Sequence, residues 1–230
     1  MHTLSEENYL KIVYFLELRE GAKASPTSIA ETLGNSPASV VDMLKKLRGK
    51  KLIQYDKSRG ARLTETGKRT ALGVVRNHRL WEVFLHEKLG YSWDEVHPLA
   101  EQLEHVHDPL LADRLDKYLG FPQYDPHGDP IPKQDGKIAR LPRTTLMEIT
   151  PGNTCRVVAV KDTSAPFLQY LAKLNIGIGT QLKVEEVIAY DGSLTIKLDR
   201  NTATVSKKFA ESIIVDNVKS LTIAGRTARE

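Results

Sequence analysis

Two carboxylates and one imidazole are spaced so that they share one face of a predicted helix. Glu101, Glu104 and His105 occupy positions i, i+3 and i+4, and residues at these spacings are neighbours on a helix surface. Carboxylate oxygens and imidazole nitrogens are common protein ligands for divalent transition metals. The spacing therefore predicts a metal site to which one rigid element supplies three ligands.

A second face of the same kind lies earlier in the chain. His78 and Glu82 are four residues apart in a predicted long helix, and His97 lies one turn before Glu101. If the two helices pack together, six possible ligands meet in one seam. Residues 78–127 support this interpretation, because they include six of the seven histidines and carry a net charge of −6 from ten acidic and four basic residues. A solvated acidic surface with incidental histidines is the alternative.

A strongly basic segment precedes the acidic one. Residues 45–69 contain ten Lys and Arg against two acids, a net charge of +8, although the formal charge of all 230 residues is only +4. Such a concentration of positive charge is typical of a surface that binds nucleic acid. The small overall charge thus conceals one segment suited to phosphate and another suited to cations.

The pattern of apolar residues predicts a winged helix-turn-helix around the basic segment. A turn at Gly34 and Asn35 joins two short helices, which is the spacing of this motif. Gly21 is expected to end the helix before them. The predicted elements are a capped amphipathic helix, the two short helices and a β-hairpin, at residues 4–20, 26–33, 37–48 and 52–67.

Helices continue through the acidic segment and give way to strands after Pro142. Pro98 predicts a kink or a late start in the second of these helices. Residues 120–142 contain five prolines and three glycines, which predicts a loop or linker. The predicted helices are 66–89, 92–107 and 109–120, followed by strands at 154–161, 181–190, 193–198 and 212–215 and a short helix at 165–174.

The second helix of the helix-turn-helix is the predicted recognition helix. In this fold its N-terminal residues face base edges in the major groove, and here they are Ser36, Pro37, Ala38 and Ser39. Because they are small and include no Arg, we expect only modest direct readout of bases. Salt-sensitive contacts to phosphates are expected from Lys45, Lys46, Lys57, Arg59 and Arg62.

Three motifs and their order resemble one protein family. The motifs are HRLWEVFL at 78–85, EQLEHVHD at 101–108 and DPHGDPIP at 125–132. Placed between a winged helix and a small barrel, they resemble the metal-dependent repressors typified by the diphtheria toxin repressor and the manganese transport regulators, over nearly the whole chain. The resemblance implies a mainly α-helical fold with a small β-barrel. It divides the chain into a winged helix-turn-helix DNA-binding domain, a helical dimerisation and metal-binding domain and an SH3-like (FeoA-type) barrel, at residues 1–72, 73–141 and 142–230.

The resemblance also implies two metal sites in each subunit. The implied ligands of the primary site are Asn8, Glu101, Glu104 and His105, where family members usually have Asp or Met in place of Asn8. A second site would use His78, Glu82 and His97, and His78 could serve either site. In members with the Pro-His-Gly loop, further ligands come from the positions that are Asp125, His127 and Asp162 here. The first of these positions is often Cys.

Oxygen ligands favour manganese. Iron-selective relatives place sulfur at the positions of Asn8 and Glu101, whereas this chain offers oxygen at both. Hard oxygen ligands suit Mn²⁺ better than softer ligand sets do, so we expect Mn²⁺ in preference to Fe²⁺. The implied function is a transcriptional repressor that binds palindromic operator DNA as a homodimer when loaded with either ion, and that controls metal uptake genes.

Other classes of protein fit the sequence less well. No apolar run of about 18 residues predicts a membrane span, and the N-terminus lacks the features of a signal peptide, so a cytoplasmic protein is expected. The single cysteine, Cys155, cannot form an internal disulfide and is expected to be buried. An enzyme is not expected, because no nucleophile with a general base and no Gly-rich phosphate loop accompanies the carboxylates. A winged-helix regulator whose barrel senses a small molecule or peptide is the alternative. His86 and His107 fit no ligand face and are expected at the surface.

Overall fold

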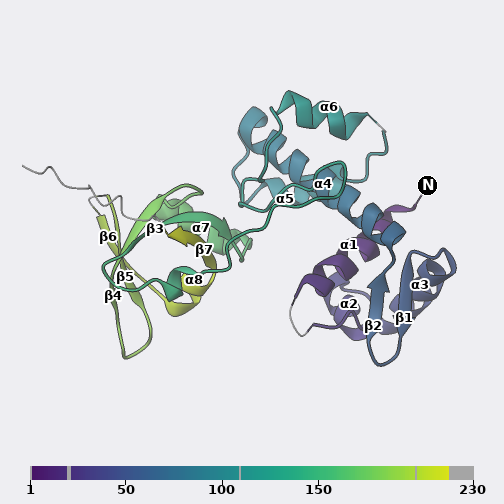
Figure 1. Cartoon of the computed structure of the whole chain (residues 1–230), viewed down its shortest axis with the longest axis horizontal. Coiled ribbons are helices and arrows are strands. Elements are labelled where there is room, and N and C mark those ends of the chain that lie inside the picture. The colour runs from purple at the N-terminus through teal and green to yellow at the C-terminus, as the bar shows by residue number, and fades with distance from the viewer. Residues whose placement is uncertain (1, 20–21, 109, 200, 218–230) are drawn as a thin grey trace, which may run out of the picture. The chain divides into compact units, whose positions relative to one another are not determined.

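The computed structural model describes residues 2–19, 22–108, 110–199 and 201–217. They form two compact units, whose elements are labelled in Figure 1. The first unit comprises Met1–Asp125 and Pro130–Ala139, and the second comprises Pro126–Asp129 and Arg140–Glu230. No helix within the described ranges is both long and apolar enough to cross a membrane.

The first unit begins with the predicted winged helix-turn-helix. Thr3 and Glu6 form the predicted capping box at the start of the first helix. This helix ends at Leu18 rather than at residue 20, and the predicted break at Gly21 lies outside the described residues. Gly34 ends the next helix in the left-handed conformation, with φ of 66°. The elements are α1 (Leu4–Leu18), α2 (Pro26–Leu33), α3 (Pro37–Gly49) and the antiparallel strands β1 (Ile53–Asp56) and β2 (Gly60–Leu63).

One apolar core fixes the predicted recognition helix, α3, and the hairpin relative to α1. Leu10 of α1, Ile29 of α2 and Leu47 of α3 are fully buried in the same cluster, and burying each such side chain stabilises the fold by about 1.5–3 kcal/mol. Gly60 permits the hairpin to approach closely, because a Cβ atom there would lie 2.8 Å from the carbonyl oxygen of Ala24. The N-terminal elements therefore pack as one body.

Three further helices complete the first unit: α4 (Glu65–Leu89), α5 (Val96–Leu103) and α6 (Leu111–Tyr118). The predicted long helix is confirmed as α4. Helix α5 is shorter than the predicted helix over residues 92–107. It starts late, so that Pro98 lies in its first turn, where a missing N–H is tolerated. It ends at Leu103, so the prediction that His105 lies on this helix is wrong.

The second unit is built on a five-stranded antiparallel sheet with the order β6-β5-β4-β3-β7. Cys155 of β3 is completely buried, as expected. Strand β6 was not predicted from the sequence, because only Val205 in it is buried and the apolar alternation is weak. The elements are η1 (Leu146–Glu148), β3 (Thr154–Val160), α7 (Ala165–Lys173), β4 (Gln181–Val187), β5 (Leu194–Leu198), β6 (Asn201–Val205), α8 (Lys207–Glu211) and β7 (Ile213–Asn217).

Residues 120–142, all of which the structure describes, contain no helix or strand apart from an isolated bridge between Tyr124 and Pro130. The predicted loop is therefore confirmed. Within the first unit it is fixed by Arg79 of α4, whose guanidinium donates to the carbonyl oxygen of Pro130 at 2.6 Å and lies 3.5 Å from Asp125.

Candidate metal centre

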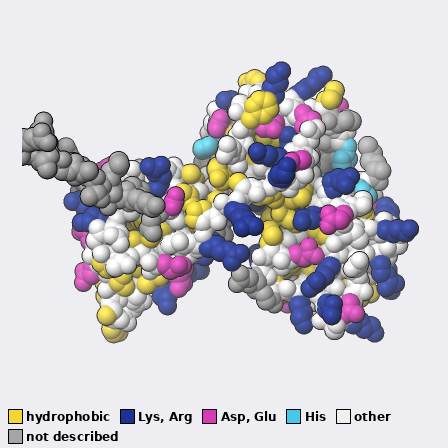
Figure 2. All heavy atoms as spheres, viewed as in Figure 1, with side chains coloured by type: hydrophobic (Ala, Val, Ile, Leu, Met, Phe, Trp, Pro, Cys, Tyr) yellow, Lys and Arg dark blue, Asp and Glu magenta, His cyan; other side chains and the backbone are white. Residues whose placement is uncertain are grey.

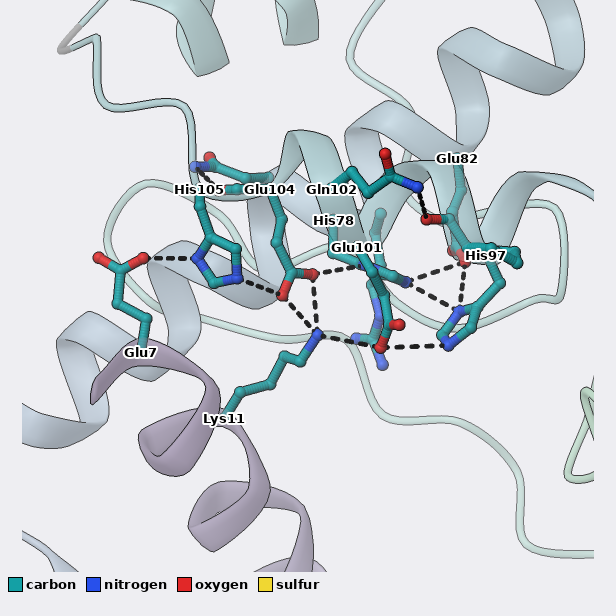
Figure 3. A network of polar contacts seen from close by, with 12 residues as sticks. Glu7, Lys11, His78, Glu82, His97, Glu101, Gln102, Glu104 and His105 are labelled. Atoms are coloured by element: carbon teal, nitrogen blue, oxygen red, sulfur yellow. Dashed lines mark hydrogen bonds and ion pairs between the residues drawn. The ribbon is translucent and has the colours of Figure 1, made fainter. Parts of the chain in front are cut away.

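Helices α4 and α5 pack together and bring three predicted ligands to one point (Figure 3). Nε2 of His78 lies 3.0 Å from Oε1 of Glu82 and 3.1 Å from Nδ1 of His97. The same nitrogen of His97 lies 3.1 Å from the same oxygen of Glu82. One ligand atom from each residue thus faces the other two, and all three lie within 4.8 Å of one another.

The chemistry of this donor set fits a divalent cation. Two imidazole nitrogens and one carboxylate oxygen are borderline and hard ligands that suit first-row transition metals. Glu82 is 2% exposed and His78 is 8% exposed, whereas the side chain of His97 is 46% exposed. The buried His78 and Glu82 hold their ligand atoms in place, and solvent reaches these atoms on the side of the half-exposed His97.

His78 also contacts the second group of predicted ligands. Its Nδ1 atom lies 2.6 Å from Oε2 of Glu104. Burial alone would lower the pKa of His78, but hydrogen bonds with Glu104 and Glu82 outweigh it and raise the pKa to about 9. Burial would raise the pKa of Glu104, but His78 and Lys11 outweigh it and hold that pKa below its ordinary value. The imidazole therefore lies between two carboxylates and interacts with both.

Lys11 of α1 completes the surroundings of Glu104. Its Nζ atom lies 2.6 and 2.8 Å from the two carboxylate oxygens of Glu104, and 3.7 Å from Oε1 of Glu101. Glu104 is 1% exposed, and Asn77 of α4 donates to its carbonyl oxygen at 3.0 Å. The carboxylate of Glu104 therefore lies buried between the imidazole of His78 and the ammonium group of Lys11.

His105 lies just beyond α5 and faces α1. Its Nδ1 atom is 2.7 Å from Oε2 of Glu7, and its Nε2 atom is 3.2 Å from Oε1 of Glu104. The other oxygen of Glu7 lies 3.3 Å from Nε2 of His107. His107 is exposed, as expected for a surface residue, and so is His86.

The residues of α1 that meet this cluster are Glu7 and Lys11, and sequence reasoning missed both. Asn8 is only partly buried, and within the described residues it makes no hydrogen bond to Glu104 or His105. A signal was present, because Glu7 and Lys11 are four residues apart and share one helix face with opposite charges. The role of Asn8 as a ligand stays a prediction.

The remaining predicted ligands belong to different units. Asp125 is buried in the first unit beside Arg79. His127 is buried in the second unit, where its carbonyl oxygen accepts a hydrogen bond from Val160 at 3.0 Å. Asp162, also in the second unit, accepts a hydrogen bond from the backbone N–H of Ser164 at 2.9 Å, and hydrogen bonds from Ser164 lower its pKa. That these three residues share one metal site stays a prediction.

Part of the acidic segment has a structural role. Asp113 and Asp116 of α6 lie 3.2 and 2.7 Å from the buried guanidinium of Arg76 in α4. Burial raises the pKa of Asp116, and this effect outweighs the attraction of Arg76. These two carboxylates join α6 to α4 and are not among the predicted ligands.

The predicted DNA-contacting residues lie at two places on the first unit. Ser36 is the N-cap of α3 and accepts a hydrogen bond from the backbone of Ser39, and residues 36–39 are all exposed. Figure 2 shows Lys and Arg side chains spread over the part of this unit that carries α3 and the hairpin. The predicted phosphate-binding residues Lys45, Lys46, Lys57, Arg59 and Arg62 are all exposed.

Lys46 of α3 and Lys50, the residue that caps the C-terminus of α3, form ion pairs with α1. Nζ of Lys46 lies 3.0 Å from Oε1 of Glu6, and Nζ of Lys50 lies 2.7 Å from the same oxygen. Glu6 is completely buried. The charge of Lys46 is therefore partly neutralised by Glu6. Lys57 and Arg59 lie exposed at the turn of the hairpin.

Three family descriptions match successive parts of the chain. Residues 1–61 match the N-terminal DNA-binding domain of the iron-dependent repressors, residues 64–133 match their metal-binding and dimerisation domain, and residues 144–217 match the FeoA domain. The expected fold, a winged helix-turn-helix followed by a helical domain and an SH3-like domain, is confirmed.

Individual proteins agree with these matches. The iron-dependent repressor IdeR of Mycobacterium leprae is 33% identical over 159 residues, which make up 66% of this chain and 69% of that protein. IdeR of Mycobacterium tuberculosis is 37% identical over 126 residues, so the match spans 55% of this chain and about half, 54%, of that relative.

A solved structure is similar over almost the full length. It is described as a manganese-dependent transcriptional repressor in complex with manganese, has a TM-score of 0.82 and 35% sequence identity, and covers 93% of this chain and 100% of its own. These relatives are repressors and not enzymes. The matched domains and the relatives together show that the chain belongs to the family of metal-dependent transcriptional repressors typified by the diphtheria toxin repressor.

Proposed function

We propose that this chain is a manganese-responsive repressor. In the cytoplasm it binds palindromic operator DNA as a homodimer when loaded with Mn²⁺, or less readily with Fe²⁺, and it controls metal uptake genes. The observation that carries the proposal is the meeting of His78, Glu82 and His97 at one point in the unit that also contains the recognition helix. Relatives named for iron and for manganese are both similar to this chain.

The choice of metal rests on the ligand atoms. Glu82, Glu101 and Glu104 offer oxygen, and the only cysteine is buried in β3 of the second unit. Hard oxygen ligands suit Mn²⁺, whereas sulfur ligands favour softer ions. We assign His78, Glu82 and His97 to one site, and Glu101, Glu104 and His105 with Asn8 to a second. Asp125, His127 and Asp162 are additional candidate ligands.

Helix α1 connects the proposed metal centre to the DNA-binding elements. A bound divalent cation would supply positive charge that offsets the carboxylates between α4 and α5. Glu7 and Lys11 of α1 contact His105 and Glu104, and α1 shares its core with α2 and α3. Metal binding can favour the DNA-competent arrangement only as far as the ion binds that arrangement more tightly.

Exposed apolar side chains support the homodimer. Leu110, Tyr118 and Phe121 in the helical part of the first unit are each more than half exposed. An apolar surface of this kind is typical of an interface, and a two-fold operator requires a two-fold protein. The matched domain description also names dimerisation.

A DNA mobility-shift assay with metal titration tests the proposal. We expect the natural chain to shift a palindromic operator only with Mn²⁺, and a chelator to reverse the shift. Glu82→Gln should require about tenfold more Mn²⁺ or worse, because the uncharged amide is a weaker ligand. Glu87→Gln on the exposed part of the same helix is the matched control and should behave like the natural chain. DNA binding that is insensitive to the chelator would contradict metal dependence, and a lower midpoint for anaerobic Fe²⁺ than for Mn²⁺ would overturn the choice of metal.

A further inference from the structure

Lys11 is an unusual residue to find beside the predicted ligands. It is only 9% exposed, and its ammonium group reaches from α1 to the end of α5 (Figure 3). There it lies 2.6 and 2.8 Å from the two oxygens of Glu104 and 3.7 Å from Glu101. A positive charge of the protein itself thus occupies the space between two carboxylates that a divalent cation would use.

Both oxygens of Glu104 are engaged by groups of the first unit. Lys11 contacts the two of them from α1, and Nδ1 of His78 contacts Oε2 from α4. A metal ion that binds a carboxylate oxygen must come closer to it than a hydrogen-bonded ammonium does. A divalent ion at that distance would lie close to the ammonium group of Lys11, and the repulsion between the two charges in a buried place is large.

We propose that Lys11 is an internal cation that competes with the metal ion for Glu104 and Glu101. A divalent ion that binds through these carboxylates must displace the ammonium group toward solvent. This inference rests on the proposed metal-dependent function and concerns the site formed by Glu101, Glu104 and His105. At the other site, Lys11 forms no hydrogen bond or ion pair with His78, Glu82 or His97 in the described part of the chain, although its charge acts on His78 from a distance.

The competition has a consequence for affinity. In the natural chain the free energy of metal binding at Glu104 is reduced by the loss of a buried ion pair, whose removal is costly because it leaves a charge without its partner. A neutral residue at position 11 removes this competitor and leaves Glu104 free to bind the ion. Lys11 would therefore set the Mn²⁺ concentration at which this site fills.

Neutral variants of Lys11 test the proposal by direct metal binding. We would measure Mn²⁺ binding by equilibrium dialysis, with the electron paramagnetic resonance signal of free Mn²⁺ as readout, for the natural chain, Lys11→Met and Lys11→Gln. Both variants should bind Mn²⁺ about tenfold more tightly at one site. Adding Glu104→Gln to either variant should abolish that gain. Lys11→Arg, which keeps the charge, should not show it.

Lys50→Met is the matched control, because Lys50 is also paired with a buried carboxylate, that of Glu6, but lies away from the predicted ligands. It should leave Mn²⁺ binding unchanged. If Lys11→Met and Lys11→Gln bind Mn²⁺ as the natural chain does, or more weakly, Lys11 is a structural ion-pair partner and the proposal is wrong. If the natural chain itself binds no Mn²⁺, the proposed function fails instead.

A measurement on the natural chain covers the case in which the variants do not fold. The rate at which Lys11 is acetylated by acetic anhydride can be followed by mass spectrometry of peptides, with Lys50 as internal reference. Saturating Mn²⁺ should increase the rate at Lys11 several-fold and leave the rate at Lys50 unchanged. An equal or lower rate at Lys11 in the presence of Mn²⁺ would overturn the proposal.

Discussion

Nδ1 of His78 lies 2.6 Å from Oε2 of Glu104, while the other nitrogen of the same ring faces Glu82 and His97. One imidazole therefore belongs to both groups of predicted ligands. The two groups are adjacent parts of one polar network between α1, α4 and α5. His78 joins them directly, and a longer contact of 3.7 Å between Nε2 of His97 and Oε1 of Glu101 joins them a second time.

Replacing His78 should therefore damage metal binding more than replacing His97. We expect His78→Ala to lower Mn²⁺ affinity by about 10–100-fold, because a ligand and a partner of Glu104 are lost together, and His97→Ala to have a smaller effect. Titration calorimetry measures both. His86→Ala, on the exposed face of the same helix, is the control. Equal losses for His78→Ala and His97→Ala would argue against the shared role of the ring.

Glu6 should stabilise the attachment of α3, the predicted recognition helix, to α1. Burial would raise its pKa, but hydrogen bonds from Lys50 and Lys46 outweigh burial and lower the pKa to about 2. Because the pKa is lower in the folded protein than its ordinary value of 4.5, the contribution to stability is full above pH 4.5 and is lost as the pH falls toward 2.

Urea unfolding of Glu6→Gln tests this expectation. The free energy of unfolding at pH 7 should fall by about 1–2 kcal/mol, a modest loss because both lysines are about half exposed. The difference from the natural chain should shrink between pH 4.5 and 2. Glu31→Gln, an exposed residue of α2, is the control. A difference that stays constant down to pH 2 would contradict the assignment.

Cys155 should be inert in the folded protein. It is completely buried in β3, its thiol donates to the carbonyl oxygen of Leu182 at 3.6 Å, and burial raises its pKa to about 11. Because the thiolate is the reactive form, we expect almost no reaction with Ellman's reagent at pH 8 without denaturant and rapid reaction in urea. Fast labelling of the native chain would show that the second unit opens readily.

Operator binding should depend steeply on salt, through the turn of the hairpin. We expect affinity to fall by orders of magnitude between about 50 and 200 mM salt, and Lys57→Ala or Arg59→Ala to reduce the slope of log affinity against log salt by about 1 each. Lys46→Ala should reduce it less, because Glu6 already shares that charge. Lys173→Ala, in α7 of the second unit, is the control. A flat salt response would contradict phosphate binding.

The sequence was sufficient to predict most elements and the meeting of His78, Glu82 and His97. Helical periodicity and capping residues are local signals, so α1, α2, α3 and α4 were predicted nearly to the residue. His78 and Glu82 are one turn apart on α4, and their meeting with His97 needs only that α4 and α5 pack face to face. Strand β6 could not be predicted because its residues are mostly polar and exposed.

The contacts of α1 with the ligand cluster could not be predicted, because they join residues almost a hundred positions apart. Lys11 and Glu104 meet only because α1 packs against α4. A helical pattern shows which residues share a face of α1, but not what that face meets. The resemblance to a family implies Asn8 as a ligand, whereas Glu7 and Lys11 on the same helix contact His105 and Glu104.

The early end of α5 at Leu103 separates two neighbours in the sequence. Glu104 keeps a helical conformation and points to His78 and Lys11, while His105 lies in the following turn and reaches Glu7. Two consecutive residues therefore link α4 and α1: Glu104 contacts both helices, and His105 contacts α1. Sliding of α1 along α4 would stretch the Lys11–Glu104 and Glu7–His105 contacts together, so we expect the position of α1 to change whenever a metal ion displaces groups of this cluster.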